Sequence, residues 1–135
     1  MKTVLFICTH NAGRSQMAEG MANHMFPDKV EAKSGGSKPS TINPLAIKVM
    51  KEIGIDISRQ RSKHLDELEG QQFDVVVTMC TEDEDMCPFF PGGKEYIHHS
   101  FADPSRVTGT EEQKLQAVRV IRDDILEWIK ATFII

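Results

Sequence analysis

The fold is decided by residues 3–20, TVLFICTHNAGRSQMAEG. The first part, Thr3–Ile7, is β-branched and continuously apolar, which is typical of a central strand covered on both faces. A helical pattern starts at Ser15. One face of this helix is expected to carry the apolar side chains of Met17, Ala18, Met21, Ala22 and Met25. The intervening segment Cys8–Arg14 therefore forms a short loop between a buried strand and the start of a helix.

The rest of the chain repeats this alternation of strands and helices. Apolar runs predict further strands over Val30–Ser34, Phe73–Met79 and Glu95–His99. Helices are predicted from Pro44, behind an Asn43 cap, and from Thr110 to about Thr132, where Thr110 and Gln113 are spaced as a capping box. Alternating elements predict an α/β fold with a parallel sheet, and ligands bind beyond the carboxyl ends of its strands.

Composition limits the class of protein. A chain of 135 residues fits one domain, 1–135. The net charge of −4 argues against nucleic-acid binding, and no apolar run approaches the roughly 18–20 residues of a membrane helix. The chain has three cysteines, which is an odd number, and its sequence shows no export signal. We therefore expect a cytoplasmic protein whose thiols are reactive.

The loop after the first strand has the features of an oxyanion site. Its sequence, Cys8-Thr9-His10-Asn11-Ala12-Gly13-Arg14-Ser15, places a cysteine and an arginine around five residues. Backbone N–H groups of such a loop can form a nest for a tetrahedral anion, and the helix adds the positive end of its dipole. Arg14 supplies a planar fork of donors, while the same field and the Ser15 hydroxyl favour the thiolate form of Cys8. The alternative is an inert buried thiol and a surface arginine.

The chain resembles the low-molecular-weight protein tyrosine phosphatase family, and within it the arsenate reductases. The resemblance runs through residues 6–20, NPLAIKVMKEIGIDIS at 43–58, DVVVTMC at 74–80, Cys87-Pro88 and FADPSRVTGTEEQK at 101–114. The loop departs from the usual phosphatase pattern, because His10-Asn11-Ala12-Gly13 replaces an apolar residue and a second cysteine. The family implies a three-layer α/β sandwich around a four-stranded parallel sheet of order 2-1-3-4.

The resemblance also implies a role for each remaining cysteine. In thioredoxin-coupled arsenate reductases, Cys8 would attack arsenic, Cys80 would attack Cys8 and expel arsenite, and Cys87 would take over the disulfide. Phosphate would compete with arsenate for the loop. The segment from Cys80 to Lys94, with the acids Glu82–Asp85, is expected to be a mobile loop that lets this relay move. Cys80 could instead be a small buried hydrophobe, or a zinc ligand with Cys87, His98 and His99.

Two further residues are assigned by the resemblance. Asp103, before Pro104, would be the general acid for the leaving oxygen, although Asp-Pro is also an ordinary turn. Lys63 stands at a position where some relatives carry an aspartate that helps to bind potassium. Its ammonium group would lie near Asn11, Glu19 and Ser34, so we expect no potassium dependence and no other cofactor or metal.

Other functions remain open at this point. The main alternative is a tyrosine phosphatase in which Cys80 and Cys87 protect the site from oxidation. A non-catalytic redox sensor is disfavoured because it needs no leaving-group acid. The reductant is expected to be thioredoxin, with glutaredoxin or a small thiol as the alternatives.

Overall fold

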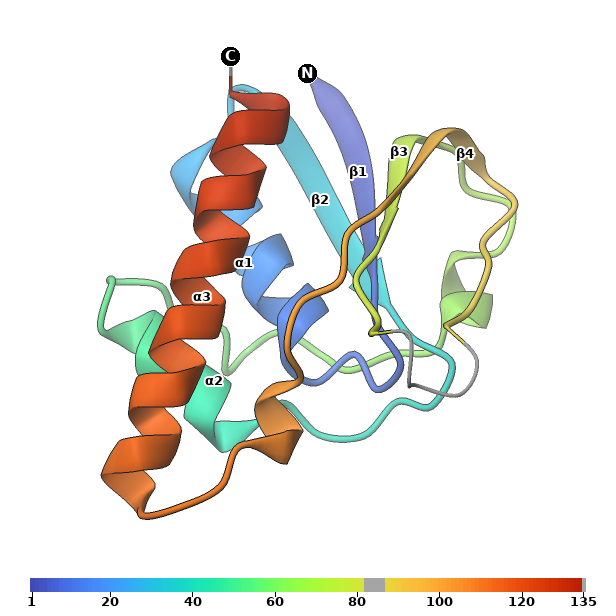
Figure 1. Cartoon of the computed structure of the whole chain (residues 1–135). Helices are drawn as coiled ribbons and strands as arrows, with labels where there is room; N and C mark the ends of the chain where they lie inside the picture. Colours follow the sequence, from blue (N-terminus) through green and yellow to red (C-terminus); the bar gives the residue numbers. More distant parts are fainter. Residues whose placement is uncertain (82–86, 135) are drawn as a thin grey trace.

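The computed structural model describes residues 1–81 and 87–134. Within this part of the chain, four parallel strands form one sheet of order β2-β1-β3-β4. The strands are β1 (Lys2–Ile7), β2 (Val30–Gly35), β3 (Phe73–Thr78) and β4 (Gly93–His98), as Figure 1 shows. The predicted α/β class and the strand order implied by the family resemblance are both confirmed.

Both faces of the sheet are covered, as the apolar runs predicted. On one face, Val4 and Phe6 join a large core shared with α1 (Arg14–Met25) and α3 (Glu111–Phe133), and α2 (Pro44–Lys51) packs on α3 (Figure 1). On the other face, Leu5 and Ile7 belong to a smaller core. A single 3₁₀ turn, η1 (Leu65–Leu68), contributes to that core where a longer helix could have stood.

The helix ends follow the local signals. The Asn43 side chain accepts a hydrogen bond from the backbone N–H of Leu45 at 2.8 Å, with Pro44 in the first position. Thr110 and Gln113 form the predicted capping box. One detail differs from the prediction: Met25 is 41% exposed, because the last turn of α1 extends past the core.

The carboxyl ends of the strands meet at one edge. Ile7 pairs with Gly35 on one side and with Thr78 on the other, and Thr78 pairs with His98. The loops that follow these strands therefore lie together at the lower end of the sheet in Figure 1, beside the short turn η2 (Pro104–Arg106). Residues 82–86 of the predicted mobile loop lie outside the described residues. No helix in the described ranges is long and apolar enough to cross a membrane.

Candidate active site

The loop between β1 and α1 surrounds a pocket of about 230 Å³ at this edge. The backbone turns at Asn11, whose φ of 48° is left-handed and is a conformation that asparagine tolerates. Gly36, just after β2, packs against the loop so closely that a Cβ would stand 2.5 Å from the carbonyl oxygens of Cys8 and Thr9. Only glycine fits there, and its close approach holds the loop in place.

The pocket collects most of the residues expected at an oxyanion site. From the loop it is lined by Cys8, His10, Ala12, Gly13 and Arg14, and from other segments by Ser40, Asn43, Asp103, Pro104 and Ser105. Three predicted residues, Thr9, Asn11 and Ser15, are buried and are not part of this lining. Their side chains act from behind the pocket, through the contacts below.

The candidate nucleophile Cys8 is buried and has a polar partner. Its Sγ lies 2.8 Å from the hydroxyl oxygen of Ser15. The same hydroxyl oxygen accepts a hydrogen bond from Nδ2 of Asn11 at 2.8 Å. Because this oxygen is already an acceptor, the Ser15 proton is available for donation to the sulfur.

Asn11 is held by a buried polar frame. Its Oδ1 accepts hydrogen bonds from Nε2 of Gln16 and from the backbone N–H of Lys63, both at 3.0 Å. The Lys63 ammonium lies 3.8 Å from a carboxylate oxygen of Glu19, which also accepts the Ser34 hydroxyl at 2.6 Å. A lysine therefore supplies a cation directly behind the loop, at the place expected from the resemblance.

Arg14 is buried at the pocket wall and is fixed in orientation. Its Nη1 donates to the carbonyl oxygens of Met79 at 3.4 Å and Phe101 at 3.3 Å. Its Nη2 stands 3.7 Å from Oδ2 of Asp103. The guanidinium is thereby tied to the segments that follow β3 and β4, so the tertiary structure aims the donor fork before any anion arrives.

Asp103 lines the same pocket. Its Oδ1 accepts the backbone N–H of Ser105 at 2.9 Å and the Ser105 hydroxyl at 2.8 Å, and so it caps η2. Its Oδ2 lies near Arg14 and 4.0 Å from Nε of Arg106. The side chain is only 13% exposed and lines the same pocket as Cys8.

The other two cysteines form a disulfide beside this pocket. The Cα atoms of Cys80 and Cys87 are 5.8 Å apart, within the range of about 4.4–6.8 Å that a disulfide requires. Thr9, the neighbour of Cys8 in the chain, places its hydroxyl 3.7 Å from Sγ of Cys80. One free thiol and one redox-active pair therefore lie at the same edge. The bond between the two cysteines leaves no thiolate pair for zinc, and no metal-binding group of three His, Cys, Asp or Glu occurs in residues 1–81 and 87–134.

Comparison with known proteins agrees with this geometry. Residues 3–119 match the family model of the low molecular weight phosphotyrosine protein phosphatases. The chain belongs to this family. It is 44% identical to an arsenate reductase of Halalkalibacterium halodurans over 129 residues, which cover 96% of this chain and 93% of that protein.

Solved arsenate reductases share the fold of this family member. One, captured in a phosphate binding state, superposes with a TM-score of 0.82 at 32% identity and covers 97% of this chain and 95% of its own. A thioredoxin-dependent arsenate reductase of Corynebacterium glutamicum gives a TM-score of 0.64 at 31% identity, over 98% of this chain and 63% of its own.

The local sequence did not indicate that several further residues of this phosphatase-family chain belong to the site. Ser40, Asn43 and Ser105 reach the pocket from segments distant in the chain. Gly36 could have been suspected only as one glycine among several in a loop. Gln16 looked like an ordinary helix residue, yet it is fully buried against Asn11.

Proposed function

We propose that this protein reduces arsenate to arsenite, with Cys8, Cys80 and Cys87 handling the two electrons in turn. The observation that carries the proposal is the single edge that holds both an anion-sized pocket around the free Cys8 and the Cys80–Cys87 disulfide. A phosphatase uses the first of these and has no chemical need for the second. The arsenate reductases that resemble the chain support this assignment.

The first step is a substitution at arsenic. Arsenate is tetrahedral like phosphate, so it fits the nest, where Arg14 pairs with two of its oxygens. The Cys8 thiolate attacks arsenic, and one oxygen leaves as water. The proton for this oxygen comes from the carboxyl group of Asp103, which lines the same pocket.

The next two steps move the electrons. The Cys80 thiolate attacks Sγ of Cys8, and the electron pair of the sulfur–arsenic bond stays on arsenic, which leaves as arsenite. The Cys87 thiolate then attacks Cys80 and releases Cys8 as a thiolate. A free Cys8 beside a Cys80–Cys87 disulfide is the arrangement expected after one turnover.

The cycle closes when an external dithiol reduces the disulfide. We assign this role to thioredoxin, and the thioredoxin-dependent structural neighbour supports that choice. Because the relay works only when its thiols can be re-reduced, the cytoplasm is the expected compartment. Phosphate should compete with arsenate for the pocket.

A weak phosphatase activity should accompany reduction. Cys8, Arg14 and Asp103 are the groups that phosphoester hydrolysis needs. None of the described residues that line the pocket is Phe, Tyr or Trp, so no large aromatic ring is available there to stack on a phenyl group, and the imidazole of His10 is the one aromatic ring in this lining. Small activated phosphoesters should therefore be hydrolysed slowly, without preference for phosphotyrosine peptides.

The test separates the relay from the anion site. Cys80→Ser and Cys87→Ser should each abolish multiple turnover of arsenate with thioredoxin, thioredoxin reductase and NADPH. Both variants should keep the hydrolysis of para-nitrophenyl phosphate, whereas Cys8→Ser should lose both activities. In Cys87→Ser, one equivalent of arsenite should form together with a Cys8–Cys80 disulfide, seen by peptide mass mapping. Full arsenate turnover by both single variants would refute the relay.

A further inference from the structure

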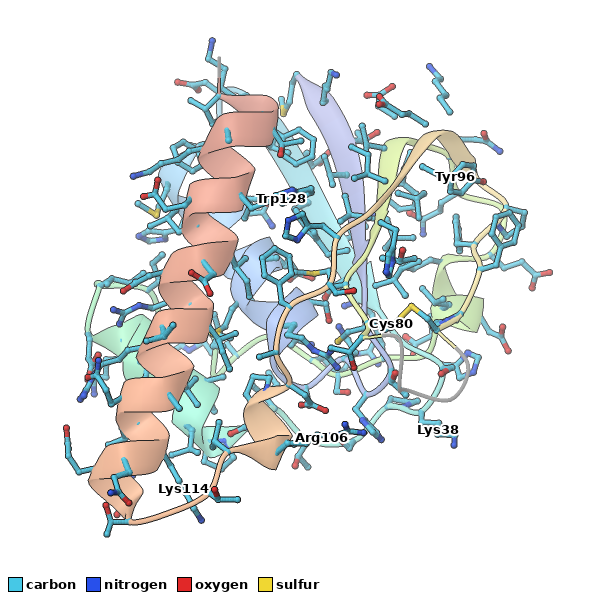
Figure 2. All side chains as sticks on the ribbon, viewed as in Figure 1. Lys38, Cys80, Tyr96, Arg106, Lys114 and Trp128 are labelled. Atoms are coloured by element: carbon cyan, nitrogen blue, oxygen red, sulfur yellow. A yellow bond between two sulfur atoms is a disulfide. The ribbon has the colours of Figure 1, made fainter. Side chains whose placement is uncertain are left out.

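Two aromatic side chains are exposed in the part of the chain that follows the disulfide. Phe89, two residues after Cys87, is 73% exposed, and Tyr96 of β4 is 46% exposed. Their rings stack with centroids 5.3 Å apart and planes inclined by 26°. Figure 2 shows Tyr96 and the Cys80 disulfide on the same side of the molecule, away from α3. Large exposed aromatic groups of this kind are common anchors of protein–protein contacts.

The pair is held rigidly rather than left on a loose loop. The Tyr96 hydroxyl donates to the carbonyl oxygen of Phe90 at 2.9 Å and accepts the backbone N–H of Gly93 at 3.1 Å. The next ring, Phe90, is buried edge-on against Phe73 at 5.7 Å. Phe89 therefore stacks on a tyrosine whose position is fixed by two hydrogen bonds, which reduces the conformational entropy lost when a partner covers the pair.

The surface beside the pair is hollowed. A depression of about 260 Å³ lies between η1 and the segment 89–92 and includes Leu65, Gly70, Phe89 and Phe90 in its lining. It is separate from the Cys8 pocket, with which it shares no lining residue. The depression therefore has no part in the chemistry at Cys8, and it adds a concave surface next to Phe89 whose lining is mixed, because it also includes Asp66 and Glu69.

The two sulfurs of the disulfide differ in access. Cys80 is fully buried, whereas Cys87 is partly exposed. Since a nucleophile must reach the sulfur that it attacks, the approach to this disulfide is over Cys87. A small thiol needs no surface for this step, but a protein must rest on the residues around Cys87, and Phe89 of the stacked pair follows Cys87 by two residues in the chain.

We propose that Phe89 and Tyr96 form the docking surface for the protein dithiol that reduces the Cys80–Cys87 disulfide, an oxidoreductase of the thioredoxin class. This inference rests on the proposed function, which leaves that disulfide to be reduced after each turnover. The partner's thiolate attacks Sγ of Cys87, the bond between the two sulfurs breaks, and Cys80 leaves as a thiolate. The partner's second thiol then attacks its own mixed disulfide and releases Cys87, so one dithiol is oxidised as one disulfide is reduced.

The test measures disulfide reduction directly and needs no arsenate. Oxidised protein is mixed with reduced thioredoxin or with dithiothreitol, and the appearance of the two new thiols is followed by alkylation and mass spectrometry. The second-order rate constant with thioredoxin is divided by the one with dithiothreitol. This ratio separates docking from the intrinsic reactivity of the disulfide, because dithiothreitol needs no docking surface. Phe89→Ala should lower this ratio at least tenfold, and Phe89→Trp, which keeps a large ring, should restore most of it.

Val120→Ala serves as the matched control, because Val120 is also an exposed apolar side chain, at 51%, but it lies on α3. Its ratio should equal that of the wild type. An unchanged ratio in Phe89→Ala would overturn the proposal. So would a change in oligomeric state of Phe89→Ala with no change in the ratio, since the aromatic pair would then be a contact between copies of this chain. If thioredoxin reduces the disulfide rapidly but arsenate is not turned over, the proposed function fails and the docking surface stands.

Discussion

Replacing Asn11 tests the frame that supports the nucleophile. Asn11→Ala removes the acceptor for the backbone N–H of Lys63 and the donor to the Ser15 hydroxyl. The side-chain amide of Gln16 is not left unpaired, because its Nε2 keeps hydrogen bonds to the backbone carbonyl oxygens of residues 11 and 61. A buried donor left without a partner costs about 1–3 kcal/mol, and a lost hydrogen bond about 1 kcal/mol. The φ of 48° adds about 1 kcal/mol for an alanine.

The expected loss for Asn11→Ala is therefore about 3–5 kcal/mol in the free energy of unfolding, a large share of the roughly 5–15 kcal/mol of a typical domain. It should appear as a fall of about 12–20 °C in Tm, at about 4 °C per kcal/mol. Urea unfolding followed by circular dichroism measures the free energy directly. Asn11→Gly is the matched variant, because it loses the same side chain and tolerates the left-handed backbone.

Asn11→Gly should accordingly be more stable than Asn11→Ala by about 1 kcal/mol, while both lose arsenate turnover to the same extent because Ser15 is no longer held. If Asn11→Ala unfolds within about 1 kcal/mol of the wild type, the buried frame does not support the loop as reasoned. If the glycine and alanine variants are equally stable, the argument from φ is wrong.

Three further predictions follow from the geometry. Arg14→Lys should lower kcat/KM for arsenate at least a hundredfold in the coupled NADPH assay, because a point charge cannot replace a two-oxygen fork; a loss below tenfold would contradict this. Gly36→Ala should cost about 1–3 kcal/mol in urea unfolding and weaken the competition by phosphate, since a Cβ displaces the Cys8 loop. The backbone N–H of Thr3, and then Lys94, hold the pKa of Asp74 below its ordinary value, so its contribution to stability is present above about pH 4 and is lost as the pH falls further. Asp74→Asn should thus be less stable than the wild type at pH 7, and the difference should shrink at pH 3; a gap independent of pH would exclude this linkage.

Local sequence was sufficient for the secondary structure and for the centre of the site. The apolar run Thr3–Ile7 and the periodicity after Ser15 depend on neighbouring residues, and so they predicted β1, α1 and the loop between them. The cap at Asn43 and the capping box at Thr110 were predicted for the same reason, because both ends of each interaction lie within three residues. The strand order came from the family resemblance, and the composition of the elements alone would have left it open.

Only the tertiary structure decided how distant segments meet at the carboxyl edge. Parallel pairing brings the ends of β1, β3 and β4 together, and this places Asp103 in the same pocket as Cys8 and the Thr9 hydroxyl against Cys80. No local pattern marks such contacts, because they join residues about 70 to 95 positions apart in the chain. The outward position of Phe89 is of the same kind, since it depends on the Tyr96 hydroxyl and on the burial of its neighbour Phe90 against Phe73. The sequence by itself thus determined which chemical groups the protein has, and the packing of the sheet determined which of them can act together.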